Sequence, residues 1–171
     1  MKKIIYVALA MLVLASCEKP NKIGFVDNGT VINDFQEKID VESRFKEKEE
    51  AFRKRADSIG KAFQAEAQST QAIAQKSSQK KAQELMGGLQ QKQQQLQQQM
   101  QFEQQQLQQS FQVEIDSVIV KVKDFVKDYG KTNGYTYILG TSDAAATVMY
   151  GADENDLTKT ILEALNADVK K

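Results

Sequence analysis

Residues 40–63 read DVESRFKEKEEAFRKRADSIGKAF, and residues 84–107 read ELMGGLQQKQQQLQQQMQFEQQQL. Both belong to a segment, residues 40–129, that contains no proline and only the glycines Gly60, Gly87 and Gly88. Its other residues are mostly Ala, Gln, Lys, Glu, Arg, Leu and Met, which are good helix formers. Because an average globular helix has about a dozen residues, this segment predicts an extended, coiled-coil-like helical structure and not a packed globular core.

Apolar and small residues recur in this segment with a period of eleven residues. The first row is Val41, Phe52, Phe63, Ala74, Leu85, Leu96, Leu107, Val118 and Tyr129. The second row is Phe45, Ala56, Ala67, Ser78, Leu89, Met100, Phe111 and Val122. Residues four apart share one face of a helix, so the two rows form a single stripe. A repeat of about 3.67 residues per turn predicts a nearly straight or slightly right-handed coil.

The composition of the stripe changes along the segment. Its ends carry Phe, Val, Ile and Tyr, whereas residues 67–78 contribute only Ala and Ser. Residues 90–112 are mostly Gln. Such a tract can be disordered, but the interleaved apolar residues keep helical spacing and favour a helix with a polar outer face. We therefore expect a firmly packed base and a loosely packed far end.

Gly87 and Gly88 lie near the midpoint of the segment. Two glycines inside a helix cost roughly 2 kcal/mol relative to alanine, and glycine is comfortable where φ is positive. We interpret the pair as the tip of an antiparallel helical hairpin over residues 39–129, with arms roughly 65–70 Å long at 1.5 Å per residue. The alternative is one unbroken helix, which the uninterrupted eleven-residue phase favours. The need to bring terminal strands together favours the hairpin.

The amino terminus has the features of an export signal. Met1-Lys2-Lys3 precedes an apolar run over residues 4–14, and Leu14-Ala15-Ser16-Cys17 resembles a bacterial lipobox. The run is too short for an ordinary transmembrane helix. We predict a lipoprotein signal peptide over residues 1–16, acylation of Cys17, the only cysteine, and a lipidated tether over residues 17–21. A plain signal peptide with an incidental cysteine is the alternative.

The two ends of the mature chain are expected to form a β-rich body from residues 22–38 and 130–171. Residues 22–26 read as a strand, and Thr30 is a candidate N-cap for a helix over residues 31–37. Asp40 or Ser43 is the candidate cap of the long helix, which Gly130 and Asn133-Gly134 end. Residues 135–139 and 147–150 predict a strand hairpin, followed by a helix over residues 157–167. The fold class is therefore α+β.

Composition argues against several kinds of chemistry. The chain has 23 basic and 23 acidic residues, and its balance does not favour nucleic acid as a partner. It lacks His, the usual general base and commonest metal ligand. The acidic residues Asp153, Glu154 and Asp156 are better placed to cap the helix that follows than to bind a metal. We expect no catalytic residues, no cofactor and no metal site.

The order of strand, long helical hairpin, strand pair and short helix resembles the Skp/OmpH family of periplasmic chaperones. The motifs that carry the resemblance are KIGFVD at residues 22–27, GYTYIL at 134–139, VMY at 148–150, DLT at 156–158 and ILEAL at 161–165. Membership implies a trimer with a β-rich trimerisation body and three helical arms. It also implies ATP-independent holding of unfolded β-barrel outer-membrane proteins, here by a lipid-anchored protein that faces the periplasm. The enteric members are soluble and strongly basic, whereas this chain is near neutral and carries a lipobox.

Five apolar residues of the Gln-rich region are candidates for binding unfolded clients: Phe102, Leu96, Met100, Leu107 and Phe111. All of them except Phe102 lie on the stripe, so the alternative is that these four residues hold the two arms of the hairpin together. Phe102 lies off the stripe and is the better client candidate. The alternative function is that of a structural or adaptor lipoprotein, with a coiled coil that spans part of the envelope or docks onto a transport complex.

Overall fold

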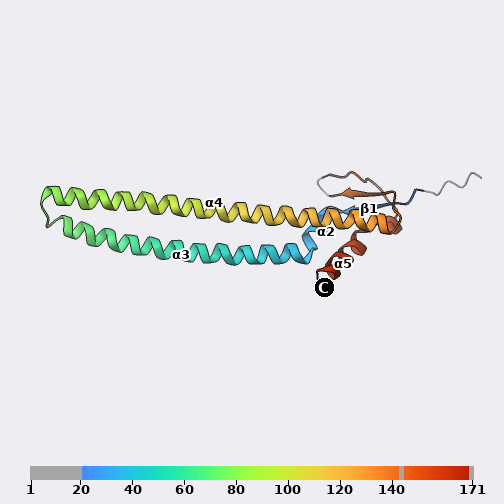
Figure 1. The fold of residues 1–171 in the computed structure, drawn as a ribbon, viewed down its shortest axis with the longest axis horizontal. Helices are drawn as coiled ribbons and strands as arrows, with labels where there is room; N and C mark the ends of the chain where they lie inside the picture. The colour runs from blue at the N-terminus through green and yellow to red at the C-terminus, as the bar shows by residue number, and fades with distance from the viewer. Residues whose placement is uncertain (1–20, 143–144, 170–171) are drawn as a thin grey trace, which may run out of the picture.

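The computed structural model describes residues 21–142 and 145–169. Two long helices, α3 (Gln36–Ala74) and α4 (Gln79–Thr132), lie side by side and project from a small body at one end (Figure 1). The body holds the strands β1 (Ile23–Asp27) and β2 (Tyr137–Thr141), the helices α2 (Asn28–Asp34) and α5 (Thr158–Asp168), and a 3₁₀ turn, η1 (Asp153–Asn155). This confirms the α+β class with a helical hairpin arm. None of the described helices has the length and apolarity needed to cross a membrane.

The sheet of the body has two parallel strands, and the helical hairpin connects them. Ile23 is opposite Tyr137, and the register continues to Asp27 opposite Thr141. The predicted strand at residues 147–150 is wrong: this segment is irregular, and the expected carboxyl-terminal hairpin does not form. A β-prone sequence becomes a strand only where it meets the edge of another strand. Within this chain β2 pairs with β1, and Met149 and Tyr150 remain 88% exposed.

The helix starts differ from the local caps that the sequence suggests. Asp27, and not Thr30, caps α2, with its carboxylate accepting a hydrogen bond from the Thr30 N–H at 3.1 Å. The long helix α3 begins at Gln36, ahead of Asp40 and Ser43, and the Gln36 N–H donates to Oδ1 of Asn166 in α5 at 2.8 Å. The cap of α3 therefore comes from a residue remote in sequence, which ties the arm to the body.

The end of α4 follows the predicted pattern. Asn133 is the C-cap, and Gly134 adopts a positive φ of 71°. The Tyr135 N–H donates to the Gly130 carbonyl at 2.9 Å, and the Tyr135 ring stacks on that of Tyr129 with centroids 6.3 Å apart. This is a Schellman closure with its apolar contact, and it turns the chain directly into β2.

The hydrophobic core lies in the body and at the base of the arms. Its fully buried members are Val26, Val31, Phe35, Val41, Phe45, Val118, Val122, Leu157, Ile161 and Leu165. The helix α5 is held against β1 because the Leu157 N–H donates to the Phe25 carbonyl at 2.8 Å. Gly24 lies close to this contact, since an added Cβ would be 2.5 Å from Cδ1 of Leu157 and would force that side chain to move. The base of the hairpin is therefore anchored in a core that α3 and α4 share with β1 and with the short helices α2 and α5.

The predicted tip at Gly87 and Gly88 is wrong, and so is the alternative of one unbroken helix. The chain reverses at residues 75–78, between the end of α3 and the start of α4. Ser77 N–H donates to the Ala74 carbonyl at 3.1 Å, and Ser78 is extended, with ψ of 154°. Gly87 and Gly88 lie inside α4, where an added Cβ would meet nothing within 4 Å. The pair lies about two turns from the start of α4 and about twelve turns from its end, so the helix continues through both glycines.

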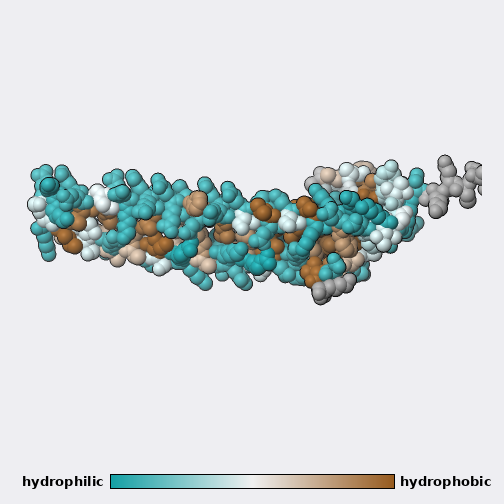
Figure 2. Space-filling model, in the orientation of Figure 1, coloured by the Kyte–Doolittle hydropathy of each residue, from teal (hydrophilic) through white to brown (hydrophobic). Residues whose placement is uncertain are grey.

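The eleven-residue stripe forms the seam between α3 and α4. Every described member of both rows is buried or half-buried except Ser78, which lies in the turn. Only the members at the base are fully buried: Val41, Phe45, Val118 and Val122. Figure 2 shows apolar side chains along the middle of the arm, with polar side chains around them.

Candidate functional site

Two neighbouring hollows open along the seam. The first has a volume of about 440 Å³ and lies near the base, with walls that include Phe45, Phe52, Leu107 and Phe111. The second has a volume of about 350 Å³ and lies farther out, with walls that include Phe63, Leu96 and Met100. Phe52 and Gln104 line both hollows. We call the two adjoining hollows together the seam groove.

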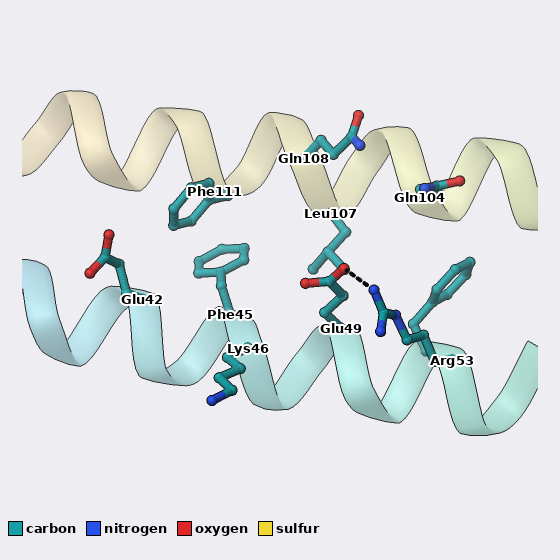
Figure 3. Close-up of a pocket in the computed structure, with 10 residues that line it drawn as sticks. Glu42, Phe45, Lys46, Glu49, Arg53, Gln104, Leu107, Gln108 and Phe111 are labelled. Atoms are coloured by element: carbon teal, nitrogen blue, oxygen red, sulfur yellow. Dashed lines mark hydrogen bonds and ion pairs between the residues drawn. The ribbon is translucent and has the colours of Figure 1, made fainter.

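Aromatic rings dominate the inner part of the seam groove. Phe45 from α3 and Phe111 from α4 face each other with ring centroids 5.1 Å apart and a tilt of 57° (Figure 3). Leu107 points into the same space, and Glu49 and Arg53 form an ion pair of 3.3 Å at the rim. Such tilted aromatic pairs are favourable. The groove therefore combines an apolar floor with a charged but internally neutralised edge.

A ladder of ion pairs joins the two helices beside the groove. Arg44 bonds Glu114 at 2.6 Å, Arg55 bonds Glu103, and Glu66 bonds Lys92. Each step is eleven residues along α3 and eleven residues back along α4. A further pair at the base joins Glu37 to Lys121 at 2.7 Å. The ladder matches the register of the hairpin. The eleven-residue spacing of its charges is a second sequence signal of that register, beside the apolar stripe.

The structure separates the five predicted client-binding residues into two groups. Four of them are half-buried in the seam and also line the groove: Leu96, Met100, Leu107 and Phe111. They therefore hold α3 and α4 together and still expose one side to the groove. Phe102 lies on the outward side of α4 and is 59% exposed. Client binding by these five residues stays a prediction. Cys17 lies outside the described residues.

The charged groups outside the groove form ordinary surface interactions. Lys61 and Asp57, one helical turn apart, approach to 2.7 Å. A hydrogen bond to Asp57, supported by Coulomb attraction, raises the pKa of the Lys61 ammonium above its usual value, so the group stays charged. Near the turn, Lys81 pairs with Glu84 at 3.4 Å. These contacts pair opposite charges on the arm surface.

Of the three acidic residues before α5, Asp156 contacts the start of that helix, whereas Asp153 and Glu154 lie in the 3₁₀ turn η1. Oδ1 of Asp156 accepts hydrogen bonds from the Thr158 N–H at 2.9 Å and from the Thr158 hydroxyl at 2.5 Å. This is the interaction expected of a carboxylate at a helix N-terminus. Among the residues that the structure describes, no group of three or more His, Cys, Asp or Glu side chains is arranged to hold a metal ion.

A small body with a long two-helix arm, an apolar groove along that arm and a leader with a lipobox together describe an exported, arm-bearing lipoprotein. The family model described as outer membrane protein (OmpH-like) matches residues 22–165, and the model of a prokaryotic membrane lipoprotein lipid attachment site matches residues 1–17. The chain therefore belongs to the OmpH-like family, and it is an exported, membrane-anchored protein. Membership in the family supports a chaperone role in general terms and a non-enzymatic protein.

The fold is also similar to a solved structure. The crystal structure of an OmpH-like protein from Caulobacter crescentus CB15 superimposes with a TM-score of 0.76 at 16% sequence identity. The match covers 90% of this chain and 89% of the Caulobacter chain. At that identity the likeness establishes the shared fold. The comparison with curated protein sequences gives no match.

Proposed function

We propose that the protein is an ATP-independent holdase that binds unfolded outer-membrane proteins and delays their aggregation. The observation that supports this most is the seam groove, whose aromatic and aliphatic walls stay half-exposed along the arm. Covering apolar surface contributes about 25 cal/mol per Å², so an apolar client segment gains free energy by lying in the groove. A holdase needs no chemistry beyond this preference for the unfolded chain.

We further propose that the protein is a homotrimer joined through the β-rich body. The body of the single chain is small, and its sheet has only two strands in the described residues. Several large apolar side chains of the body are exposed: Ile23, Tyr137, Leu139, Met149 and Tyr150. Clusters of this kind on a small body favour association. Three arms around one axis give a space between them in which a client is surrounded.

The proposed location follows from the anchor. Acylation of Cys17 with several chains gives stable attachment, where a single chain is marginal. We infer that the body and arm face the periplasm, where unfolded β-barrel proteins pass. Residues 18–22 connect the anchor to β1, so the body lies close to the membrane surface.

The experiment that tests the holdase is an aggregation assay with an unfolded β-barrel protein and the chain from Glu18 onward, which contains every described residue. A holdase suppresses light scattering at near-stoichiometric ratios without nucleotide. A structural or adaptor lipoprotein, the alternative function, leaves scattering unchanged. Exchange of Phe52, which lines both hollows, for Gln is expected to weaken suppression. The matched control is Ala51→Gln at the exposed neighbouring position.

A further inference from the structure

A separate cleft lies in the body, between the last turns of α4 and the start of β2. Its volume is about 370 Å³, and Val126, Gly130 and Ile138 give it an apolar floor. The helix approaches the strand closely because Gly130 has no side chain: an added Cβ would lie 3.2 Å from Cδ1 of Ile138. The half-buried ring of Tyr135 forms part of the wall. We call this feature the body cleft.

Three lysines of α4 line the body cleft: Lys123, Lys127 and Lys131. All three are exposed, and their spacing of four residues places them on one face of the helix over about 12 Å. Lys131 approaches Asp128 at 3.5 Å, whereas Lys123 and Lys127 have no ion-pair partner among the described residues. We call these three residues the lysine row.

The acidic residues of this part of α4 lie beside the lysine row. Asp124 and Asp128 each follow a lysine of the row by one position, which is about 100° around the helix, and neither lines the cleft. Residues 123–131 therefore keep a net charge of +1. Lys22 adds a further positive charge, since its Nζ lies 4.0 Å from the centre of the Tyr135 ring. The cleft is therefore a basic site with an apolar floor.

The residues that precede β1 meet the same cleft. Thr136, which lines it, donates its N–H to the Lys22 carbonyl at 2.8 Å, and its hydroxyl lies 3.4 Å from Oδ1 of Asn21. The start of β1 and the end of α4 lie together at the end of the molecule away from the turn (Figure 1). Asn21 follows the lipid attachment site Cys17 by four residues, a span of at most about 14 Å. The anchor therefore holds the body cleft near the membrane surface.

We propose that the body cleft binds the phosphate headgroup of an anionic lipid in the membrane that carries the anchor. The ammonium groups of the lysine row bind phosphate as point charges. The apolar floor at Val126 and Ile138 accommodates the glycerol and the first methylene groups of the lipid. A bound headgroup gives the body a second attachment besides Cys17 and limits its rotation about the short tether. The proposal goes beyond the proposed holdase function and does not rest on it.

The position of the cleft favours a lipid over other anions that lysine binds. Free phosphate and acidic proteins reach every exposed lysine of the arm, whereas lipid headgroups are concentrated where the anchor is. Attraction to an anionic membrane extends over about one Debye length, roughly 10 Å at 0.1 M salt. Only basic groups close to the anchor gain from this attraction, and the lysine row lies beside the residues that lead to the anchor.

The test uses the full acylated protein in phosphatidylcholine vesicles with about 20% phosphatidylglycerol as the anionic lipid. A trace of the phosphatidylglycerol carries a photoreactive group on its headgroup, and mass spectrometry quantifies cross-linking to residues 121–137. One variant neutralises the lysine row (K123Q, K127Q and K131Q), and a second keeps its charge (K123R, K127R and K131R). The matched control neutralises three exposed lysines of the arm that also have no ion-pair partner in the described part of the chain (K54Q, K76Q and K80Q).

The Gln variant of the lysine row is expected to cross-link roughly tenfold less than the wild type, because the groups that attract the headgroup are gone. The Arg variant and the arm control are expected to match the wild type. Sodium chloride at about 0.5 M is expected to lower wild-type cross-linking to the level of the Gln variant, since salt screens the attraction.

Unchanged cross-linking of the Gln variant overturns the proposal. Equal cross-linking to a photoreactive phosphatidylcholine overturns it too, because nearness to the membrane would then explain the signal without the charge of the headgroup. Loss of cross-linking when inorganic phosphate is added at constant ionic strength assigns the cleft to free phosphate and overturns the lipid as its ligand. Client aggregation is absent from these measurements, so their outcome is independent of the holdase function.

Discussion

The base and the far end of the arm follow one sequence pattern but pack very differently. At the base, Val41, Phe45, Val118 and Val122 are at most 6% exposed and join the core of the body. Near the turn the same two rows carry Ala67, Ala74, Leu85 and Leu89, which are only half-buried. Ile73 and Met86 beside them are 54% and 45% exposed. Periodicity therefore sets the hairpin, whereas residue size sets how tightly its two helices hold each other.

The difference suggests a division of labour along the arm. Local opening costs little where few apolar contacts are buried. The base has those contacts and the added cap from Asn166, so it keeps the orientation of the arm. The far end has a thin seam and two helical glycines, so we expect it to adapt to clients of different size. The predictions below alter one region at a time.

The largest expected effect is at the base. Phe45→Ala removes a 6% exposed ring that faces Phe111, and the free energy of unfolding is expected to fall by about 3 to 4 kcal/mol. Leu89→Ala removes a half-buried side chain near the turn and is expected to cost about 1 kcal/mol. Urea unfolding of the two variants measures both values. Equal losses at the two sites would contradict a base that is packed more firmly than the far end.

The next effect concerns the two glycines. Gly87→Ala with Gly88→Ala is expected to stabilise the protein by about 1 to 2 kcal/mol, because both residues are helical and an added Cβ has free space. Thermal unfolding checks the sign. Destabilisation would place a turn at these residues. The stiffer arm is also expected to accommodate a narrower range of client sizes.

A smaller effect is expected at the remote cap of α3. Asn166→Ala removes the oxygen that accepts from the Gln36 N–H at 2.8 Å and is expected to cost about 1 kcal/mol. Asn166→Asp keeps an oxygen there and adds a charge that suits a helix N-terminus. We therefore expect the Asp variant to match or exceed the wild type in urea unfolding. A neutral Ala variant would show that α5 does not fix the start of the arm.

The smallest effect is expected from the ion-pair ladder. Arg55→Glu places two acidic groups together and is expected to cost about 0.5 to 1 kcal/mol. Combining it with Glu103→Arg restores an ion pair of reversed polarity, so most of the loss is expected to return. A double-mutant cycle measures the coupling. Zero coupling would indicate that the apolar seam alone sets the register.

Much of the architecture was predictable because long-range periodicity survives in the sequence. The apolar stripe correctly identified which face of each helix meets the other, and Asn133-Gly134 correctly marked the end of α4. The glycine pair indicates the wrong position for the reversal, whereas the spacing of the charges indicates the observed one. A turn at Gly87 and Gly88 would put Arg44 opposite about Lys131, with like charges together. The observed turn instead pairs Arg44 with Glu114 at 2.6 Å.

The errors in the body have a different cause. Local patterns mark Val148, Met149 and Tyr150 as strand-prone, but they do not say whether an edge is available in the same chain. The start of α3 depends on Asn166, about 130 residues away, so no local cap signal predicts it. The seam groove was not predictable either. The sequence marks its wall residues as packing residues, but how much of each stays exposed depends on the distance between α3 and α4.

The central claim is that the arm is firm at its base and compliant at its far end, and amide hydrogen exchange tests it most directly. In the chain from Glu18 onward, we expect amides around residues 41–45 and 118–122 to exchange slowly. Amides of the last turns of α3 and the first turns of α4, through Gly88, are expected to exchange much faster and to slow when an unfolded client is bound. Uniform protection along both helices, unchanged by client, would contradict the account.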